Sequence, residues 1–404
     1  MRPPRRRPGG RSAVSRQDAK IPSNVETKAL TTSASDRRAV RYDLREALWT
    51  HSDRKRLRMC GRCRASGASQ PTVRVADGVA HFTNVQTCGS IWSCPVCGPK
   101  VRQERAIEID QAMQRWLDRS GGAVLFLTLT MPHDFGDDLD ALFRVQKAAW
   151  GRIFSGRAWQ DEKAQFGLLH WIRSWDCTHG VNGWHPHAHA VLFASRTPTA
   201  VELEAIERRF HARWASAVEE RGYRRPTREN GIKLELARTR ADLAAYVAQL
   251  AVVSDANEDC KVALEVARTD LKLGRKGRRT PFEILAAFAG SGDYDQLLLW
   301  REWESATHGK HAIQWSRGLR ALLEIDERTD EEIAAEEVGG ETVYTFAADE
   351  WVAVCRVRRG QSRVLAAAEL QRPGAIAVCI AQILQEFSRE RKRQLRAPPA
   401  EAFT

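Results

Sequence analysis

The sequence has no apolar run long enough to cross a membrane. Its most apolar stretches, 124–131 and 376–384, are far shorter than the roughly 20 residues that a membrane-spanning helix needs. No apolar stretch follows the basic N-terminus, so a secretory signal is not expected. These absences exclude an integral membrane protein and predict a soluble protein that stays in the cytoplasm.

Acidic residues are too few to balance the basic ones. The 404 residues include 63 Lys and Arg against 51 Asp and Glu, so the net charge is +12 and the pI is near 9.5. The length predicts about two to three domains. A basic, unsecreted protein of this size indicates a polyanionic partner, most simply nucleic acid. Charge that serves only solubility is the alternative.

Cysteines are concentrated in one short segment. Five of the nine fall between residues 60 and 97, and four of these form the pairs Cys60-x2-Cys63 and Cys94-x2-Cys97, separated by 30 residues. This spacing fits a structural zinc site of four thiolates, with no open position for substrate. Cys88 is a spare thiol that either replaces one ligand or is simply buried. The scattered cysteines are expected in the core: Cys177, Cys260, Cys355 and Cys379.

Composition and apolar patterning together predict an α+β protein in five segments. The buried strand 123–130 and a hairpin of strands 166–176 and 186–193 form its centre, flanked by helices. The predicted segments are a disordered basic arm at 1–54, a zinc-ribbon-like module at 55–100, the α+β core at 101–255, a basic loop and Trp-bearing helical extension at 256–320, and a helical C-terminal region at 321–404.

Three histidines alternate along the second strand of the predicted hairpin. His185, His187 and His189 stand at period two, so their side chains share one face of the strand. Neutral imidazoles on a rigid strand are natural ligands for a divalent metal. Asp176, at the end of the neighbouring strand, is the candidate third ligand. The alternative is that one or two of these histidines only form local hydrogen bonds.

A candidate nucleophile follows in the next predicted helix. Asp242 and Tyr246 are four residues apart and share one helical face, with Gln249 close by. A tyrosine hydroxyl can attack a phosphodiester and form a covalent phosphotyrosine, provided that a nearby cation stabilises the charge. The alternative is that Tyr246 is a core residue and that Asp242 fills the third position of a capping box that Thr239 begins.

Taken in order, these motifs resemble the rolling-circle replication initiators of plasmids, a branch of the HUH endonuclease superfamily, and most closely the actinobacterial ones. The resemblance covers about residues 58–320. It implies an antiparallel HUH sheet with flanking helices behind the N-terminal zinc ribbon. The matching pieces are 88–97, 126–133, 183–189, Tyr246, 279–285 and 315–319.

The resemblance also implies a chemistry. His187 and His189, with Asp176, would hold Mg²⁺ or Mn²⁺ beside the scissile phosphate. Tyr246 would cut one strand at the plasmid origin, remain joined to the 5′ phosphate and release a 3′ hydroxyl, and it would rejoin strands at termination. Asp242 would activate water at that last step. Origin DNA, a host helicase and a DNA polymerase are the implied partners.

The sequence departs from this family at one position and leaves other roles open. Many relatives carry a lysine three residues after the tyrosine, where this chain has Gln249. Either Lys261 or an arginine substitutes for that lysine, or the activity is reduced. His185 and His133 are secondary candidates that support the site or contact phosphate. A basic loop is expected to bind the DNA backbone, through Lys272, Arg275, Lys276, Arg278 and Arg279.

Two other functions fit parts of the same pattern. An HUH-type transposase or relaxase shares the metal ligands and the tyrosine. A zinc-ribbon DNA-binding regulator with an inactive nuclease core would explain Gln249, but it leaves the His187–His189 pair without a role.

Overall fold

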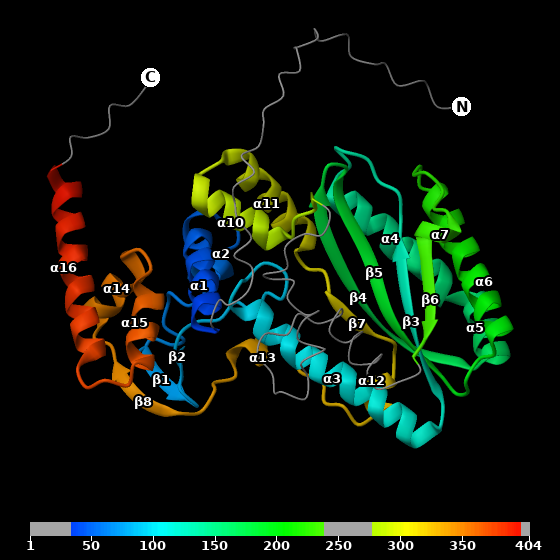
Figure 1. The fold of residues 1–404 in the computed structure, drawn as a ribbon, viewed down its shortest axis with the longest axis horizontal. Coiled ribbons are helices and arrows are strands. Elements are labelled where there is room, and N and C mark those ends of the chain that lie inside the picture. The colour runs from blue at the N-terminus through cyan, green and yellow to red at the C-terminus, as the bar shows by residue number, and fades with distance from the viewer. Residues whose placement is uncertain (1–33, 238–276, 397–404) are drawn as a thin grey trace, which may run out of the picture.

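The computed structural model describes residues 34–237 and 277–396 and contains two β-sheets with helices packed around them (Figure 1). A five-stranded antiparallel sheet forms the larger part, and a three-stranded antiparallel sheet the smaller one. The protein is thus a mixed α and β structure, as predicted. No helix in the described ranges is long and apolar enough to span a membrane.

The larger sheet has the strand order β6-β3-β5-β4-β7. Strands β4 and β5 form a long hairpin, and β3 pairs with the free side of β5. The β-branched and aliphatic residues of β3 explain its burial on both faces. The bounds are β3 Ala123–Thr130, β4 Leu168–Gly180, β5 Gly183–Ala194, β6 Ile232–Leu236 and β7 Ile313–Trp315.

One face of this sheet is covered by three helices: α4 (Leu139–Phe154), α5 (Gly156–Phe166) and α6 (Ala200–Glu219). Their apolar sides bury large aromatic residues, among them Phe210 and Trp214, which are fully buried. The helices begin where the sequence supplies caps: the Asp138 side chain accepts from Ala141 N–H, and Thr199 begins a capping box. A short helix, α7 (Arg228–Gly231), leads into β6.

On the opposite face of the sheet, the described helices cover only one half. Helix α3 (Cys97–Ser120) and the short α12 (Leu319–Leu322) pack on the half of this face where β5 ends. There Trp116 contacts Phe193, with 5.5 Å between their ring centroids. Because alternate residues of a strand share a face, His187 and His189 lie on the same face as Phe193, toward the half where β5 begins.

The smaller sheet joins segments that are far apart in the chain. Its order is β2-β1-β8, from β1 (Thr72–Ala76), β2 (Val79–Thr83) and β8 (Glu341–Thr345). Three C-terminal helices pack on it around one apolar cluster: α14 (Ala348–Arg356), α15 (Gly360–Glu369) and α16 (Ala375–Arg396). The region predicted as only helical from 321 onward therefore also contains a strand.

The N-terminal helix α1 (Ala34–His51) lies between the two parts of the molecule. Tyr42 belongs to the apolar cluster of the smaller part, whereas Leu44 and Leu48 belong to that of the larger part. The sequence prediction placed a disordered arm up to residue 54. The described part of that segment is helical instead, because its buried apolar side chains recur at helical spacing.

Four further helices contribute to the apolar cluster of the larger part. Helices α10 (Pro281–Ser291) and α11 (Tyr294–Thr307) pack against each other and bury Trp300 and Trp303. The other two are α2 (Lys55–Met59) and α13 (Asp330–Ala335), which packs against α3.

Candidate functional site

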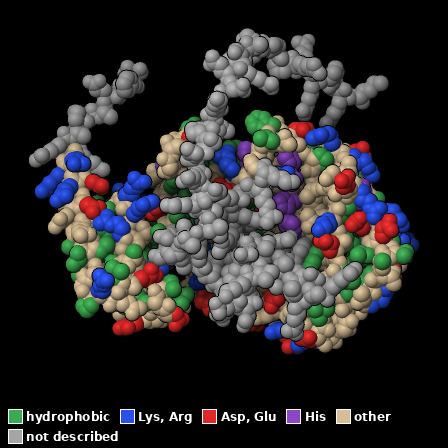
Figure 2. Space-filling model, viewed as in Figure 1, with side chains coloured by type: hydrophobic (Ala, Val, Ile, Leu, Met, Phe, Trp, Pro, Cys, Tyr) green, Lys and Arg blue, Asp and Glu red, His purple; other side chains and the backbone are tan. Residues whose placement is uncertain are grey.

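Three potential metal ligands meet on the part of the larger sheet that α3 leaves uncovered. Asp176 of β4 and His187 of β5 are direct register partners, and His189 follows two residues later on the same face. The candidate ligand atoms of these three residues all lie within 4.8 Å of one another. Figure 2 shows histidine side chains gathered on this face of the molecule. The sequence had proposed this same set.

Hydrogen bonds fix the orientation of both imidazoles. The Nδ1 of His187 lies 3.2 Å from the His185 carbonyl oxygen, and the Nδ1 of His189 lies 3.2 Å from the Thr128 hydroxyl oxygen. A carbonyl oxygen only accepts, so Nδ1 of His187 carries the proton and, in the neutral ring, its Nε2 carries the lone pair. Such a partner behind each imidazole is usual at metal sites.

This arrangement brings two acceptors together. His187 Nε2 lies 3.3 Å from Asp176 Oδ2, with the His187 side chain 15% exposed and the Asp176 side chain 31% exposed. A lone pair and a carboxylate repel at that distance unless a proton or a metal ion lies between them. The residues therefore fit a divalent cation, which satisfies both groups at once.

The carboxylate of Asp176 is held in its ionised form. Burial raises the pKa of Asp176. When His187 is protonated on both nitrogens, however, its Nε2 donates to the carboxylate, and this hydrogen bond together with the charges of His187 and His189 holds the pKa well below its usual value. The Cys177 N–H also donates to Oδ1 of Asp176, at 2.7 Å. An ionised carboxylate is the form that binds a metal.

Two further histidines, His133 and His185, lie beside the three ligands. Together with His187 and His189 they form what we call the histidine row. His133 Nδ1 lies 2.8 Å from the carbonyl oxygen of Asn182, and its Nε2 lies 2.7 Å from His185 Nδ1. Burial, together with the nearby positive charges of His187 and Arg278, lowers the pKa of His185 to about 3, and burial also lowers that of His133. The secondary candidates His133 and His185 thus form a mostly neutral pair beside the ligands.

The end of the predicted basic loop lies at the edge of this row. The backbones of Arg279 and His179 exchange two hydrogen bonds, of 2.7 and 2.8 Å. The Arg279 side chain donates to Gln296 at 2.6 Å, whereas Arg278 is exposed. The other predicted site residues lie outside the described ranges: Tyr246, Asp242, Gln249, Lys272, Arg275 and Lys276.

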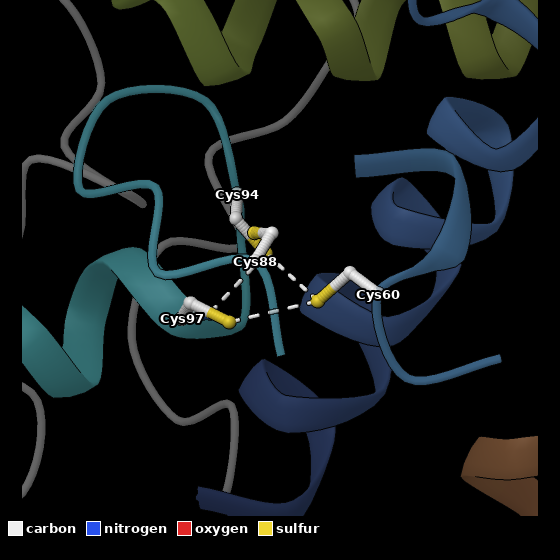
Figure 3. A group of neighbouring side chains, drawn as sticks. All are labelled: Cys60, Cys88, Cys94 and Cys97. Carbon is white, nitrogen blue, oxygen red and sulfur yellow. Dashed lines mark hydrogen bonds between the residues drawn. The ribbon is translucent and has the colours of Figure 1, made fainter. Parts of the chain in front are cut away.

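Four buried cysteines form a second cluster, where α2 ends and α3 begins (Figure 3). Cys60 Sγ lies 3.8 Å from Cys94 Sγ and 3.6 Å from Cys97 Sγ. The fourth member is Cys88, and not Cys63 as the sequence had suggested. Hydrogen bonding with Cys88, Cys94 and Cys97 lowers the pKa of Cys60 well below its usual value, which favours the thiolate that binds metals.

Backbone pairing explains why Cys88 replaces Cys63. The Gly61 N–H donates to the Gln86 carbonyl at 2.7 Å, and the Gln86 N–H donates to the Cys63 carbonyl at 2.8 Å. Gly61 adopts a φ of 64°, which suits the turn at the end of α2. This pairing brings Cys88, two residues after Gln86, beside Cys60, and Cys63 is left partly exposed.

A buried arginine that the sequence gave no reason to single out stands beside the cysteines. Arg45 of α1 is 4% exposed, and its guanidinium lies 4.3 Å from the centroid of the Tyr42 ring and donates to the Gln361 side chain. Within the described part of the chain it has no carboxylate partner. Burial lowers the pKa of Arg45, but Tyr42 and the cysteine sulfurs outweigh this and raise it. Within the cluster, the hydrogen bond with Cys60 raises the pKa of Cys88 and burial raises that of Cys94, so Cys60 is the member whose thiolate is favoured beside this cation.

Two comparisons with known proteins point to the same family. A family model described as "Replication protein" matches residues 79–202, which include β4, β5 and three of the clustered cysteines. "Protein rep" from Streptomyces lividans is 32% identical over an alignment of 352 residues that covers 70% of this chain and 75% of the relative.

A shorter match and one negative result complete the comparison. A "Neomycin resistance protein" from Streptomyces cyanogenus is 32% identical over 150 residues, covering 31% of this chain and 34% of that protein. No solved structure matches. From the extent of the match to "Protein rep" and from the family model, the chain belongs to the Rep replication-protein family, the plasmid initiators that its motifs resemble.

Proposed function

We propose that this protein initiates rolling-circle replication of a plasmid by cutting one strand of its origin DNA as an HUH tyrosine endonuclease. The observation that carries the proposal is the set Asp176, His187 and His189 on adjacent antiparallel strands. Two imidazoles and one carboxylate, on a part of the sheet that the described helices leave uncovered, suit a cation that must also reach a DNA phosphate. Membership of the Rep family supports the same conclusion.

The three ligands would hold Mg²⁺ or Mn²⁺. When bound, this ion supplies Lewis-acid stabilisation of the charge that develops on the scissile phosphate. The chain itself keeps the site ready: His185 O and Thr128 Oγ1 orient the imidazoles, and the low pKa of Asp176 keeps its carboxylate ionised at neutral pH.

Tyr246 is the proposed nucleophile. Its hydroxyl oxygen attacks the phosphorus, the bond from phosphorus to the 3′ oxygen breaks, and the departing 3′ oxygen takes a proton. The products are a 5′-phosphotyrosine and a free 3′ hydroxyl for a polymerase to extend. In the reverse reaction a 3′ hydroxyl attacks the phosphotyrosine and rejoins the strand, and Asp242 is the proposed group that activates water. Host helicase and polymerase are the proposed partners.

The cysteine cluster has a separate, structural role in this proposal. Cys60, Cys88, Cys94 and Cys97 would bind one Zn²⁺ through four thiolates, whose two excess negative charges Arg45 partly balances. Such a closed site contributes to folding and not to the cleavage reaction.

The test is a cleavage assay on single-stranded oligonucleotides that tile the origin of the parent plasmid. Wild type, Tyr246→Phe and His187→Ala are compared in Mn²⁺ and in EDTA, and Tyr294→Phe, which changes an exposed tyrosine on α11, is the matched control. We expect a covalent protein–DNA band in wild type and Tyr294→Phe with Mn²⁺ only. An adduct that persists in Tyr246→Phe would refute the nucleophile, and tight duplex binding without any adduct would favour the regulator function.

A further inference from the structure

Two adjacent arginines at the start of α10 have different surroundings. Arg279 is held by its backbone bridge to His179 and by the hydrogen bond of its side chain to Gln296. Neighbouring residues of an extended segment point to opposite sides, so Arg278 points away from Gln296. Its side chain is exposed and packs over Gly180. The Arg278 Cγ lies 3.1 Å from the position that a Cβ would occupy at Gly180.

This placement sets the Arg278 charge beside the histidine row. Burial is the main cause of the lowered pKa of His133 and of His185, and the positive charge of Arg278 adds to both shifts. Arg224, on the same side of His133, is paired with Asp134 at 2.8 Å. In the residues that the structure describes, Arg278 forms no ion pair with a carboxylate. Arg278 is therefore an exposed cation whose backbone is anchored at this edge of the sheet.

We propose that Arg278 binds a backbone phosphate of the DNA strand as it enters the site, next to the phosphate at Asp176, His187 and His189. A guanidinium matches two oxygens of a phosphodiester and keeps its charge at any physiological pH. The bridge between Arg279 and His179 fixes the backbone of Arg278 to the end of β4. The contact between Arg278 and the phosphate therefore sets how far the DNA strand extends across the histidine row. This inference rests on the proposed function.

The contact predicts a specific change in the salt dependence of DNA binding. The probe is an oligothymidine, because a phosphate contact carries no sequence information, and binding is measured in EDTA over a series of salt concentrations. Losing one phosphate contact lowers the slope of log K against log salt by about 0.7 for a single strand. We expect Arg278→Ala to show this reduced slope and an affinity reduced by about threefold to tenfold.

Two further variants complete the experiment. Arg278→Lys keeps the charge, so its slope should equal that of wild type even if its affinity falls. Arg208→Ala removes an exposed arginine on α6, on the far side of the sheet, and should change neither quantity. An unchanged slope in Arg278→Ala, or an equal loss in Arg208→Ala, would overturn the proposal. Because no metal and no cleavage are involved, failure of the tyrosine chemistry would leave this result interpretable.

Discussion

The Thr128 hydroxyl oxygen lies 3.2 Å from Nδ1 of His189, across a register pair of β3 and β5. The hydroxyl can accept the Nδ1 proton of His189 and so turn the Nε2 edge of that ring toward Asp176 and His187. A residue that never touches the cation therefore fixes the position of one of its proposed ligands.

Replacing Thr128 by Val should weaken metal binding while keeping the ligands. The valine fills the same volume but cannot orient the imidazole, and losing such a partner typically costs about 10- to 100-fold in metal affinity. Mn²⁺ binding followed by electron paramagnetic resonance measures the change. Thr130→Val is the control, because the Thr130 hydroxyl donates to the Asn230 carbonyl instead. Equal Mn²⁺ affinity in wild type and Thr128→Val would contradict this role.

Cys88→Ser and Cys63→Ser should differ in zinc content. Cys88 belongs to the buried cluster, whereas Cys63 lies outside it and is partly exposed. We expect purified Cys63→Ser to retain about one zinc per chain and Cys88→Ser to lose it, with a lower melting temperature, because a structural zinc contributes directly to folding. Metal analysis by mass spectrometry reads the outcome. Zinc lost from Cys63→Ser and kept by Cys88→Ser would reverse the ligand assignment.

Arg45→Met should release zinc faster to a chelator. Four thiolates around Zn²⁺ leave two negative charges in a buried place, and the Arg45 guanidinium is the cation that faces them. Competition with a colorimetric chelator measures the release rate. The control is Arg173→Met, which changes another buried arginine, stacked 4.4 Å from the centroid of Trp175 and away from the cysteines. The same release rate in Arg45→Met and wild type would show that the charge is unimportant.

Protonation of His170 should lower the stability of the fold in mild acid. Burial lowers the pKa of His170 below its usual value near 6.5, with a smaller effect from Lys163, so the folded protein binds a proton less readily than the unfolded chain. Its contribution to stability is complete above about pH 6.5 and is lost as the pH falls toward the lowered pKa. Melting temperatures between pH 7.5 and 5 should therefore fall less in His170→Gln than in wild type. Parallel curves would argue against this assignment.

Local patterning accounts for the centre of the larger sheet and for its candidate ligands. Strand 123–130 was predicted with the bounds that β3 has, because a continuous β-branched and aliphatic run indicates a buried strand. The turn residues between Gly180 and Gly183 marked the hairpin. Period-two spacing then put His187 and His189 on one face, and the short turn set Asp176 opposite His187.

Local patterning could not predict the contacts between segments that are far apart in the chain. Strand β8 pairs with β1, so that Thr342 lies opposite Arg74, and the sequence near residue 342 does not identify that partner. The spacing favours Cys63 as the fourth ligand, with Cys88 as a spare thiol, and only the backbone pairing of Gly61 with Gln86 shows why Cys88 takes that place. Arg45 and Thr128 gave no sequence signal of their own, because their roles depend on neighbours from other elements.

The late position of β8 in the chain also affects how the protein is made. Synthesis on the ribosome runs from the N-terminus, so all strands of the larger sheet emerge before residue 341, when β1 still exposes an unpaired edge. An unpaired strand edge invites aggregation. A nascent chain interrupted before β8 would thus carry the complete histidine row but an open second sheet, and quality control by chaperones and proteases could recognise that edge.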